Sequence, residues 1–379
     1  MKYNIDFQGS ILLSIYFKTD NIATISAPLS PPWGQINLSI ESSINKRPND
    51  ENHREPSRKR FRNVDHMQFQ PKFAIDHPHI VPIYDESTLH HIRTKCQQIC
   101  QWNRQSFPGS QPISMDKKNY NLIFQSPYMV SWKADGTRYM MLIEDKDRIY
   151  MLDRNNHVFQ IHRLLFPTTI DSNEYLKDTL LDGEFVIDKH NGTKIYRYLV
   201  YDIIMYNNVN VSQKSFHERL NIISQSIVNV RNDAIRHGHI NKAEEPFSIR
   251  NKPFWDLKDV SHLLSEQFQS QITHGCDGLV FQPVNDPYQC GRAECVLKWK
   301  EDDTIDFQLK ITNDRYSQKK EAELYLNKRI KPFAKMIYSP KLEQYNGQII
   351  ECSYRNGGWH FYRHRIDKTY PNAQGKFHF

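Results

Sequence analysis

The segment Lys133-Ala134-Asp135-Gly136-Thr137-Arg138 decides how the fold is interpreted, because it places two cationic side chains on either side of an Asp-Gly pair. Apolar and aromatic runs at 128–133 and 138–144 flank it, which predicts that one strand ends and another begins here. A third run, 148–153, follows a charged turn, and we expect the three strands to form an antiparallel meander. A lysine in such a place is commonly a solvated side chain at a hairpin, so a chemical role needs support from other charged residues.

Lys133 could act as a nucleophile only as a neutral amine. Lowering its pKa of about 10.4 by roughly 3 takes about 4 kcal/mol of electrostatic free energy. Other cations or a bound metal ion supply this free energy, because they disfavour the ammonium form. Arg138 is the first candidate cation.

Three acidic motifs lie beside a glycine or within an apolar strand: Asp182-Gly183-Glu184, Tyr201-Asp202 and Asp277-Gly278. Each Asp-Gly pair by itself indicates a turn. Carboxylates among apolar residues are unfavourable unless they are paired or bind a cation. Oxygen ligands suit Mg²⁺, which takes one or two protein carboxylates together with phosphate oxygens. The set therefore predicts a site for Mg²⁺ and a nucleotide.

A pair of lysines fits an α-phosphate. In residues 296–300, strand alternation puts Lys298 and Lys300 on one face and the apolar Leu297 and Trp299 on the other. A solvated edge strand is the alternative.

A pair of arginines near the C-terminal end fits the β- and γ-phosphates. Alternation in residues 363–368 turns Arg363 and Arg365 to one side, and guanidinium groups are well suited to phosphate oxygens. Nonspecific contact with RNA and a basic surface strand are the alternatives.

Composition limits the classes of function. The formal charge of +7 favours polyanionic partners such as nucleotides or RNA. No apolar run approaches the roughly 18 residues of a membrane helix, so we expect no membrane partner. The cysteines are too sparse for a disulfide framework and lack the histidines of a zinc site, so we expect free thiols at six positions: Cys96, Cys100, Cys276, Cys290, Cys295 and Cys352.

The first 67 residues differ from the rest of the chain. Ser, Pro, Asn and charged residues dominate 26–65, which predicts a disordered tail over 1–67. The basic cluster at 58–62 follows Lys46-Arg47 after ten residues, the layout of a two-part nuclear import signal. We therefore expect a nuclear protein, with a solvated basic linker as the alternative.

The remaining pattern indicates an α+β fold. Apolar residues at helical spacing predict a helix over 84–102, capped by Ser87, and a second helix over 215–230. The helix residues expected to be buried are Leu89, Ile92, Cys96 and Ile99, then Leu220, Ile223, Ile227 and Val228. Further strands are expected at 179–188, 197–206, 278–282, 295–300 and 304–312. Strands interrupted by scattered helices favour α+β over alternating βαβ units.

Taken in order, these motifs resemble the signature of the covalent nucleotidyltransferase superfamily, which holds mRNA capping guanylyltransferases and ATP-dependent polynucleotide ligases. They are KADGTR at 133–138, DGE at 182–184, YLVYDII at 198–204, DGLVF at 277–281, LKWK at 297–300 and RHRIDK at 363–368. The segments FPGSQPISMDKKN at 107–119 and DKTYPNA at 367–373 resemble the guanylyltransferase half of animal mRNA capping enzymes more closely.

The resemblance implies two domains. The first, over 68–300, is a nucleotidyltransferase domain of the DNA-ligase type, ATP-grasp-like, built from antiparallel sheets with helices. The second, over 301–372, is an OB-fold β-barrel that acts as a lid, and a short tail follows at 373–379.

The resemblance also implies a role for each motif residue. Lys133 attacks the α-phosphate, Arg138 holds the ribose region and Tyr201 stacks on guanine. Metal association is implied for Glu184, Asp277 and Asp306, with Glu184 also near the sugar. Phosphate contacts are implied for Lys298, Lys300, Arg363, Arg365, Asp367 and Lys368.

The implied activity is that of an mRNA 5′-cap guanylyltransferase. Such an enzyme uses Mg²⁺ or Mn²⁺, transfers GMP from GTP through a lysyl-GMP intermediate to 5′-diphosphate RNA, and releases pyrophosphate. The phosphorylated C-terminal tail of RNA polymerase II is an implied partner. An ATP-dependent polynucleotide ligase, or an inactive scaffold that binds RNA or the polymerase tail, are the alternatives.

Three features depart from the family pattern. No His-Cys start of a Cys-phosphatase loop is present, so we expect no N-terminal RNA triphosphatase domain. Glu301-Asp302-Asp303 follow Lys300 where the family commonly has a proline and a neutral stretch. Few residues follow the last motif, so we do not expect the helix that comes next in the family.

Overall fold

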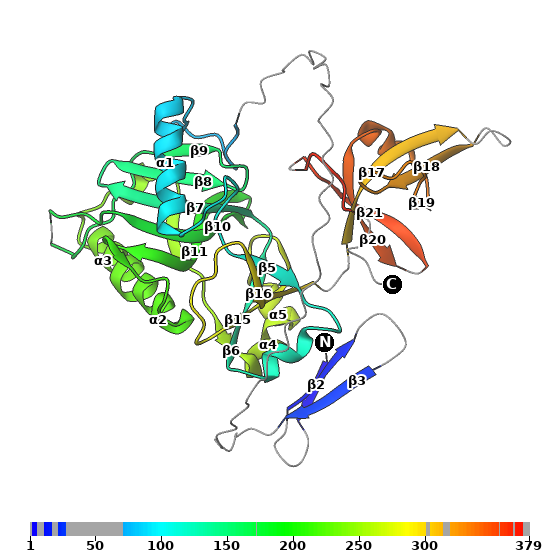
Figure 1. The fold of residues 1–379 in the computed structure, drawn as a ribbon, viewed down its shortest axis with the longest axis horizontal. Coiled ribbons are helices and arrows are strands. Elements are labelled where there is room, and N and C mark those ends of the chain that lie inside the picture. Colours follow the sequence, from blue (N-terminus) through cyan, green and yellow to red (C-terminus); the bar gives the residue numbers. More distant parts are fainter. Residues whose placement is uncertain are drawn as a thin grey trace, which may run out of the picture.

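The computed structural model describes residues 2–5, 11–16, 22–27, 71–171, 173–300, 304–313, 319–355, 357–366 and 368–373. Its strands form three sheets and a closed barrel. Figure 1 shows the sheets and helices of the cyan-to-yellow part beside the orange-to-red barrel. Over these residues no helix has both the length and the apolar character that a membrane span requires.

A small antiparallel sheet lies within the segment that the sequence predicts to be disordered. It consists of β1 (Lys2–Ile5), β2 (Ile11–Tyr16) and β3 (Ile22–Ala27), in that order. The apolar run that begins at Ile11 forms the central strand, and disorder over 1–67 stays a prediction. The two basic clusters of the expected import signal lie outside the described residues.

The largest sheet has eight strands in the order β12-β11-β10-β7-β8-β9-β4, with β13 pairing parallel to β11. Its long central strands are β7 (Thr137–Asp145), β8 (Arg148–Asp153), β10 (Thr179–His190) and β11 (Thr193–Tyr206). Shorter strands complete it: β4 (Ile80–Pro82), β9 (Val158–Ile161), β12 (Val209–Asn210) and β13 (Ser248–Asn251). The predicted strands at 148–153, 179–188 and 197–206 are confirmed.

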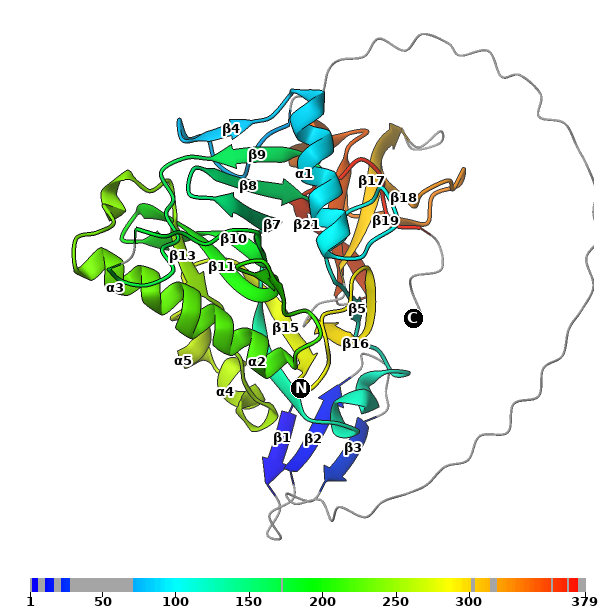
Figure 2. The ribbon, with the colours of Figure 1, turned by 60° about the vertical axis from the view of Figure 1, so that its left-hand side comes forward.

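Helices cover both faces of the eight-stranded sheet. Helix α1 (Glu86–Ile99) buries the four predicted residues against one face, where they meet Met140 and Leu142 of β7. The other face receives a continuous helical segment made of α2 (Phe216–Asn221), a π-helical turn (Ile222–Asn229) and α3 (Val230–Arg236). Figure 1 shows α1 in front of β7, β8 and β9, and Figure 2 shows α2 and α3 on the opposite side of the sheet from α1, next to β10 and β11.

The start of α1 differs from the prediction. Asp85, not Ser87, caps the helix, because its carboxylate accepts a hydrogen bond of 2.8 Å from the backbone N–H of Thr88. Both residue types are favoured at this position. Ser215 caps α2 as part of a capping box with Glu218.

A second sheet has five strands in the order β14-β6-β15-β16-β5. They are β5 (Gln111–Ser114), β6 (Tyr128–Ala134), β14 (Trp255–Asp256), β15 (Cys276–Pro283) and β16 (Arg292–Trp299). Two one-turn helices, α4 (Val260–Leu263) and α5 (Glu266–Gln269), contribute Leu263 and Phe268 to its core.

The predicted meander over 128–153 is therefore wrong in one respect. The pair β7 and β8 forms the expected hairpin, but β6 pairs with β14 and β15 instead of β7. Asp135-Gly136 is thus not a hairpin turn. It is the place where the chain crosses from the five-stranded sheet to the eight-stranded one, because the apolar residues of β6 pack with β15 and β16 in a separate core.

The C-terminal part is a closed barrel in the order β17-β18-β19-β21-β20. Its strands are β17 (Thr304–Asn313), β18 (Lys320–Tyr325), β19 (Ala334–Met336), β20 (Ile349–Arg355) and β21 (Gly358–His364). Phe307 and Trp359 meet edge to face in its core, with ring centroids 4.9 Å apart. The α+β fold of antiparallel sheets with helices, followed by a five-stranded OB-type barrel, is as predicted.

Candidate active site

Lys133 lies where the chain leaves the five-stranded sheet. It is the penultimate residue of β6, and Asp135-Gly136 carries the chain to β7. A Cβ atom at Gly136 would lie 2.3 Å from the carbonyl oxygen of Phe185, so only glycine allows this close approach to β10. The Asp-Gly pair brings Lys133 close to the eight-stranded sheet.

One carboxylate joins two of the predicted lysines. Lys133 Nζ lies 2.6 Å from Asp277 Oδ1, and Lys300 Nζ lies 2.8 Å from Asp277 Oδ2. Burial opposes ionisation of Asp277, but the two ammonium groups outweigh it and hold its pKa below the usual range. The structure therefore brings together Lys133, Asp277 and Lys300, three residues that the sequence singles out.

Gly278 allows Asp277 to reach this position. Its φ of +138° lies in a region that side chains rarely adopt, and a Cβ atom there would lie 2.0 Å from the carbonyl oxygen of Trp299. The chain at Asp277 can therefore pack directly against the end of β16, where Lys300 follows.

The predicted facing of the lysine strand is supported on its apolar side. Leu297 is fully buried in the core of the five-stranded sheet, and Trp299 packs against that core. Lys298 is half-buried on β16, opposite Val280 of β15. Lys298 and Lys300 are thus on the side away from the core.

Arg138 is more buried than its predicted role suggests. Its side chain is 4% exposed and forms a bidentate ion pair with Asp182, in which Nε donates to Oδ1 at 2.9 Å. Its NH1 group donates to the carbonyl oxygen of Ser110. Contact with a ribose would have to use the guanidinium protons that remain, so this role stays a prediction.

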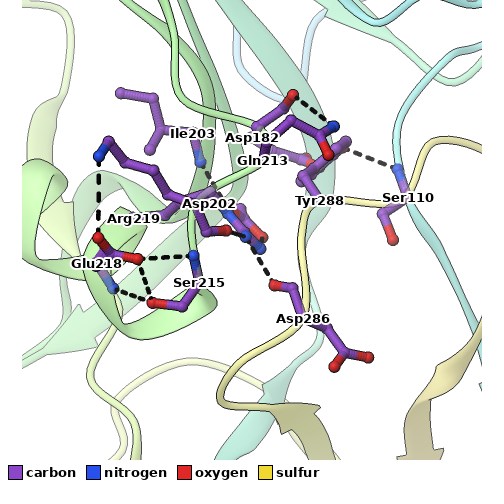
Figure 3. A network of polar contacts seen from close by, with 12 residues as sticks. Ser110, Asp182, Asp202, Ile203, Gln213, Ser215, Glu218, Arg219, Asp286 and Tyr288 are labelled. Atoms are coloured by element: carbon purple, nitrogen blue, oxygen red, sulfur yellow. Dashed lines mark hydrogen bonds and ion pairs between the residues drawn. The ribbon is translucent and has the colours of Figure 1, made fainter.

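Asp182 also receives two tyrosine hydroxyls. Tyr201 donates to Oδ1 at 3.1 Å and Tyr288 donates to Oδ2 at 2.6 Å, while the hydroxyl oxygen of Tyr288 accepts from the backbone N–H of Ser110. Figure 3 shows Asp182, Tyr288 and Ser110 in this arrangement. The Arg138 guanidinium lies 5.8 Å from the centroid of the Tyr201 ring. The hydrogen bond to Asp182 fixes the hydroxyl end of this tyrosine, which is the residue proposed to stack on a base.

A second buried ion pair lies next to Tyr201, between β11 and α2. Arg219 of α2 is fully buried, and its Nε donates to Asp202 Oδ1 at 2.6 Å. Its NH1 group donates to the carbonyl oxygens of Lys214 and Asp286, at 2.6 and 2.9 Å. Arg219 therefore ties β11, α2 and the loop before β16 together, and Asp202 is its buried counter-charge, as Figure 3 shows.

Glu184 lies next to these groups on β10. Burial raises its pKa to about 7, although Arg154, Lys133 and Arg138 each act in the opposite direction. Arg154 follows β8 and was not singled out in the sequence. Glu184 is thus placed within the electrostatic reach of the nucleophile candidate.

Lys252, which the sequence did not single out, contacts the two residues that precede Lys133. It is 5% exposed, and its ammonium group donates to the Ser131 hydroxyl and, at 2.5 Å, to the carbonyl oxygen of Trp132. Its backbone N–H donates to Val200 O at 2.7 Å, which places it between β6 and the strand of Tyr201. Burial lowers its pKa to about 7. Nothing in the sequence around it distinguishes this lysine from a solvated one.

The barrel carries the other cluster of predicted residues. Both arginines reach one buried carboxylate: Arg363 Nε lies 2.7 Å and Arg365 NH1 3.3 Å from Glu351 Oε2. This confirms that the two guanidinium groups lie on the same side. Lys300 Nζ lies 3.7 Å from Glu351 Oε1, so Glu351, which the sequence did not reveal, connects the barrel to the lysine pair.

Asp306 pairs with cations of its own barrel. Its Oδ1 lies 2.8 Å from Arg365 NH1, and its Oδ2 lies 3.7 Å from Lys368 Nζ. Asp367, Glu301, Asp302 and Asp303 lie outside the described residues.

The three carboxylates expected to associate with a metal do not gather in one place. Among the described residues, no three His, Cys, Asp or Glu side chains are arranged to hold an ion together. Asp306 is turned toward Arg365, and Glu184 belongs to the eight-stranded sheet. Asp277 alone still fits Mg²⁺, because this ion commonly takes one or two protein carboxylates and completes its shell with water and phosphate oxygens.

Comparison with known proteins agrees with this geometry. The family model "mRNA capping enzyme, catalytic domain" matches residues 79–302, and "mRNA capping enzyme, C-terminal domain" matches 289–377. The mRNA-capping enzyme of Danio rerio is 47% identical over 75% of this chain, and that of Mus musculus is 43% identical over 78%. These matches cover 48% and 50% of the two relatives, so the chain spans about half their length.

More distant proteins are also similar. The mRNA-capping enzyme subunit alpha of Schizosaccharomyces pombe is 29% identical over 74% of this chain and 77% of its own length. A solved mycobacterial DNA ligase D, complexed with ATP and MES, overlaps 69% of this chain and 95% of its own with a TM-score of 0.41 and 10% identity, a likeness too low to carry an argument. The ordered motifs, the two sheets with their barrel, and the two family matches lead to one conclusion: this chain belongs to the mRNA capping enzyme family.

Proposed function

We propose that this chain is a GTP:RNA guanylyltransferase that forms a lysyl-GMP intermediate on Lys133. The observation that carries the proposal is the shared carboxylate, because Asp277 holds the amines of Lys133 and Lys300 within 2.6 and 2.8 Å of its two oxygens. An anionic phosphate that displaced this carboxylate would lie between a nucleophile and a stabilising cation.

The first half-reaction follows from this arrangement. The neutral nitrogen of Lys133 attacks the α-phosphorus of GTP, a P–N bond forms, and the bond to the β-phosphate oxygen breaks, so pyrophosphate leaves. Asp277 Oδ1 lies 2.6 Å from the ammonium before the nucleotide binds and can take the proton whose loss makes the amine neutral. The proton released when the P–N bond forms passes to water. Lys298, Lys300 and the two barrel arginines stabilise the charge that develops on the phosphates.

In the second half-reaction the 5′-diphosphate end of RNA attacks the same phosphorus. The P–N bond breaks, the lysine amine is regenerated, and the RNA carries a GMP cap. A divalent metal ion beside Asp277 would neutralise part of the phosphate charge. The barrel must move away between the two steps for RNA to reach the same phosphorus, because Arg363 of the barrel contacts Asp135 beside Lys133.

Lys252 supports GTP over ATP when it is protonated. Its ammonium form is only a donor, and it therefore suits the O6 acceptor of guanine and not the N6 amino group of adenine. Its position beside Val200 and Ser131 lies between the strand of Tyr201, the proposed stacking residue, and the strand of Lys133. A polynucleotide ligase that uses ATP is the competing function.

The remaining expectations belong to the same proposal. We propose RNA with a 5′-diphosphate end as the acceptor, the phosphorylated tail of RNA polymerase II as a partner, and the nucleus as the location. An inactive scaffold is the alternative from another class, and the presence of Lys133, Asp277 and Lys300 in direct contact argues against it.

Labelling tests the proposal. The chain is incubated with Mg²⁺ and either α-labelled GTP or α-labelled ATP, and the labelled peptide is mapped. We expect GMP on Lys133 through a bond that is labile to acid and stable to alkali. Preferential AMP transfer would identify a ligase, and a label on any other residue would overturn the mechanism.

The preference for guanine is tested separately. Lys252→Met removes the buried donor at similar size, and we expect it to lower the ratio of GMP to AMP transfer. Lys189→Met, at an exposed position on β10, is the matched control and should leave the ratio unchanged. An unchanged ratio in Lys252→Met would mean that another group selects the base.

A further inference from the structure

His274 connects the two sheets through a chain of buried polar contacts. The indole N–H of Trp132 on β6 donates to His274 Nε2 at 2.9 Å, and His274 Nδ1 lies 2.7 Å from Asp188 Oδ1 on β10. The other oxygen of Asp188 lies 2.8 Å from Arg197 Nε on β11. We call Trp132, His274 and Asp188 the His274 bridge.

The bridge requires one tautomer of the histidine. An indole N–H can only donate, so Nε2 must accept and must carry no proton. The proton therefore resides on Nδ1, which donates to Asp188. The side chains of His274 and Asp188 are 9% and 3% exposed, so water does not substitute easily for either contact.

The charged groups around the ring agree with a neutral histidine. Burial lowers the pKa of His274, and Lys252 and Arg197 act in the same direction, while Asp188 acts against them. A protonated ring would present an N–H to the indole N–H, and the contact between the two sheets would be lost.

The backbone on both sides of His274 is also tied. The carbonyl oxygen of Thr273 accepts from Lys189 N–H at 2.8 Å, and the carbonyl oxygen of Gly275 accepts from Asp135 N–H at 2.8 Å. The loop that holds His274 is thus hydrogen-bonded to β10 on one side and to Asp135, just after Lys133, on the other. Asp277 follows His274 by three residues in the same segment.

Trp132 transmits the position of the bridge to the candidate site. It precedes Lys133, its carbonyl oxygen accepts from Lys252, and its ring lies 4.4 Å from the Lys252 ammonium. Its ring also packs against Trp255 and Phe268, with centroids 5.7 and 6.0 Å away. A shift of Trp132 would therefore displace Lys133 and Lys252 relative to β10 and β11.

We propose that His274 is a positioning residue that sets the distance between the nucleophile on one sheet and the nucleotide-holding residues on the other. This inference rests on the proposed function. Lys133 belongs to the five-stranded sheet, whereas Glu184 and Tyr201 belong to the eight-stranded one, so their relative placement depends on contacts between the sheets. Displacement of reacting groups by about 1 Å can lower a rate about a hundredfold.

Two substitutions separate this role from simple stability. His274→Gln keeps an oxygen that accepts from the indole and an amide that donates to Asp188, whereas His274→Leu keeps neither. We expect His274→Leu to lower the rate of adduct formation at saturating nucleotide at least tenfold, with a small change in the apparent affinity. His274→Gln should stay within about threefold of the unchanged protein.

His262→Leu is the matched control. Its ring also packs against Phe268, at 5.1 Å, but it is not part of the bridge. It should leave the rate unchanged. If His274→Leu folds and reacts at the rate of the unchanged protein, the positioning role is overturned and the proposed function stands. If the unchanged protein forms no adduct with any nucleotide, the proposed function fails instead.

A measurement on the unmodified protein covers the case in which His274→Leu does not fold. ¹⁵N NMR of the histidine ring reports the tautomer directly and does not depend on nucleotide transfer. A proton on Nδ1 at neutral pH, with the Trp132 indole resonance changing as the ring is protonated, supports the bridge. A proton on Nε2 would overturn it. Trp132→Phe, which removes the donor and keeps an aromatic ring, should lower the rate as His274→Leu does.

Discussion

Arg363 NH1 lies 2.6 Å from Asp135 Oδ2, so an arginine of the barrel contacts a residue 228 positions earlier, where the chain crosses between the two sheets just after Lys133. The same guanidinium donates from Nε to Glu351 of its own barrel. Arg363 therefore holds the barrel closed over the candidate nucleophile.

Removal of this contact should loosen the barrel. We expect Arg363→Ala to raise hydrogen exchange in residues 133–137 and 357–366 and to slow adduct formation, because both the contact and a phosphate cation are lost. Arg355→Ala, at an exposed arginine that ends β20, is the control and should change neither. Exchange unchanged in Arg363→Ala would show that other contacts hold the barrel.

Lys133→Arg should abolish the adduct. The guanidinium stays protonated at any workable pH and offers no neutral nitrogen, although it keeps the positive charge beside Asp277. We expect normal folding and retained GTP binding, measured by circular dichroism and calorimetry, with no labelled protein. Any GMP adduct on Lys133→Arg would exclude Lys133 as the sole nucleophile.

Lys298→Ala should slow adduct formation without changing the fold. Loss of one cation at the α-phosphate is expected to raise the barrier by about 2 to 4 kcal/mol, as with other removed transition-state contacts. Single-turnover labelling measures the rate. Lys310→Ala, an exposed lysine of β17 that packs on Tyr325, is the control. A rate within a factor of two of the unchanged protein would remove Lys298 from the site.

Lys252→Met should change how stability depends on pH. Burial lowers the folded-state pKa of Lys252 to about 7, below its ordinary value, so between these two pKa values the unfolded chain binds the extra proton. The stability of the unchanged protein should therefore rise with pH above about 7, relative to the variant, by up to roughly 3 to 5 kcal/mol near pH 10. Urea unfolding at several pH values measures the difference, and parallel curves would contradict a buried amine of lowered pKa.

Arg219→Ala should destabilise the chain strongly. The change leaves Asp202 buried without its partner, and breaking a buried ion pair in this way costs about 3 to 5 kcal/mol. Arg236→Ala removes an exposed arginine paired with Asp233 one helical turn away and should have little effect. Equal losses for the two variants would mean that the Arg219 pair contributes nothing beyond a surface contact.

The sequence predicted the strands of the candidate site well, because strong apolar periodicity surrounds each charged motif. Most predicted strand boundaries agree with the structure to within two residues, and Lys133, Asp277 and Lys300, which the sequence singles out, lie together. The pairing of β6 could not be predicted, since a run of apolar residues before Asp135-Gly136 is equally consistent with a hairpin and with a crossing between sheets.

Buried polar residues with partners on distant strands could not be predicted from the sequence for a similar reason. Lys252, His274 and Glu351 lie in segments without a distinctive charge pattern, and only the packing of distant strands gives each one its partners. Asp306, for which the resemblance implies association with a metal, pairs with Arg365 of its own barrel, and its metal role stays a prediction.

The paired charges of the candidate site have a consequence for how a ligand enters. Three cations, Lys133, Lys300 and Arg363, are each in contact with carboxylates of the protein, among them Asp277, Glu351 and Asp135. Under the proposed function the phosphates would take the positions that these carboxylates occupy beside the cations, so that binding would exchange one set of anions for another. A triphosphate that arrives alone would leave the displaced carboxylates without counter-charges. Uptake of the nucleotide should therefore be thermodynamically coupled to uptake of a divalent cation, with each weak in the absence of the other.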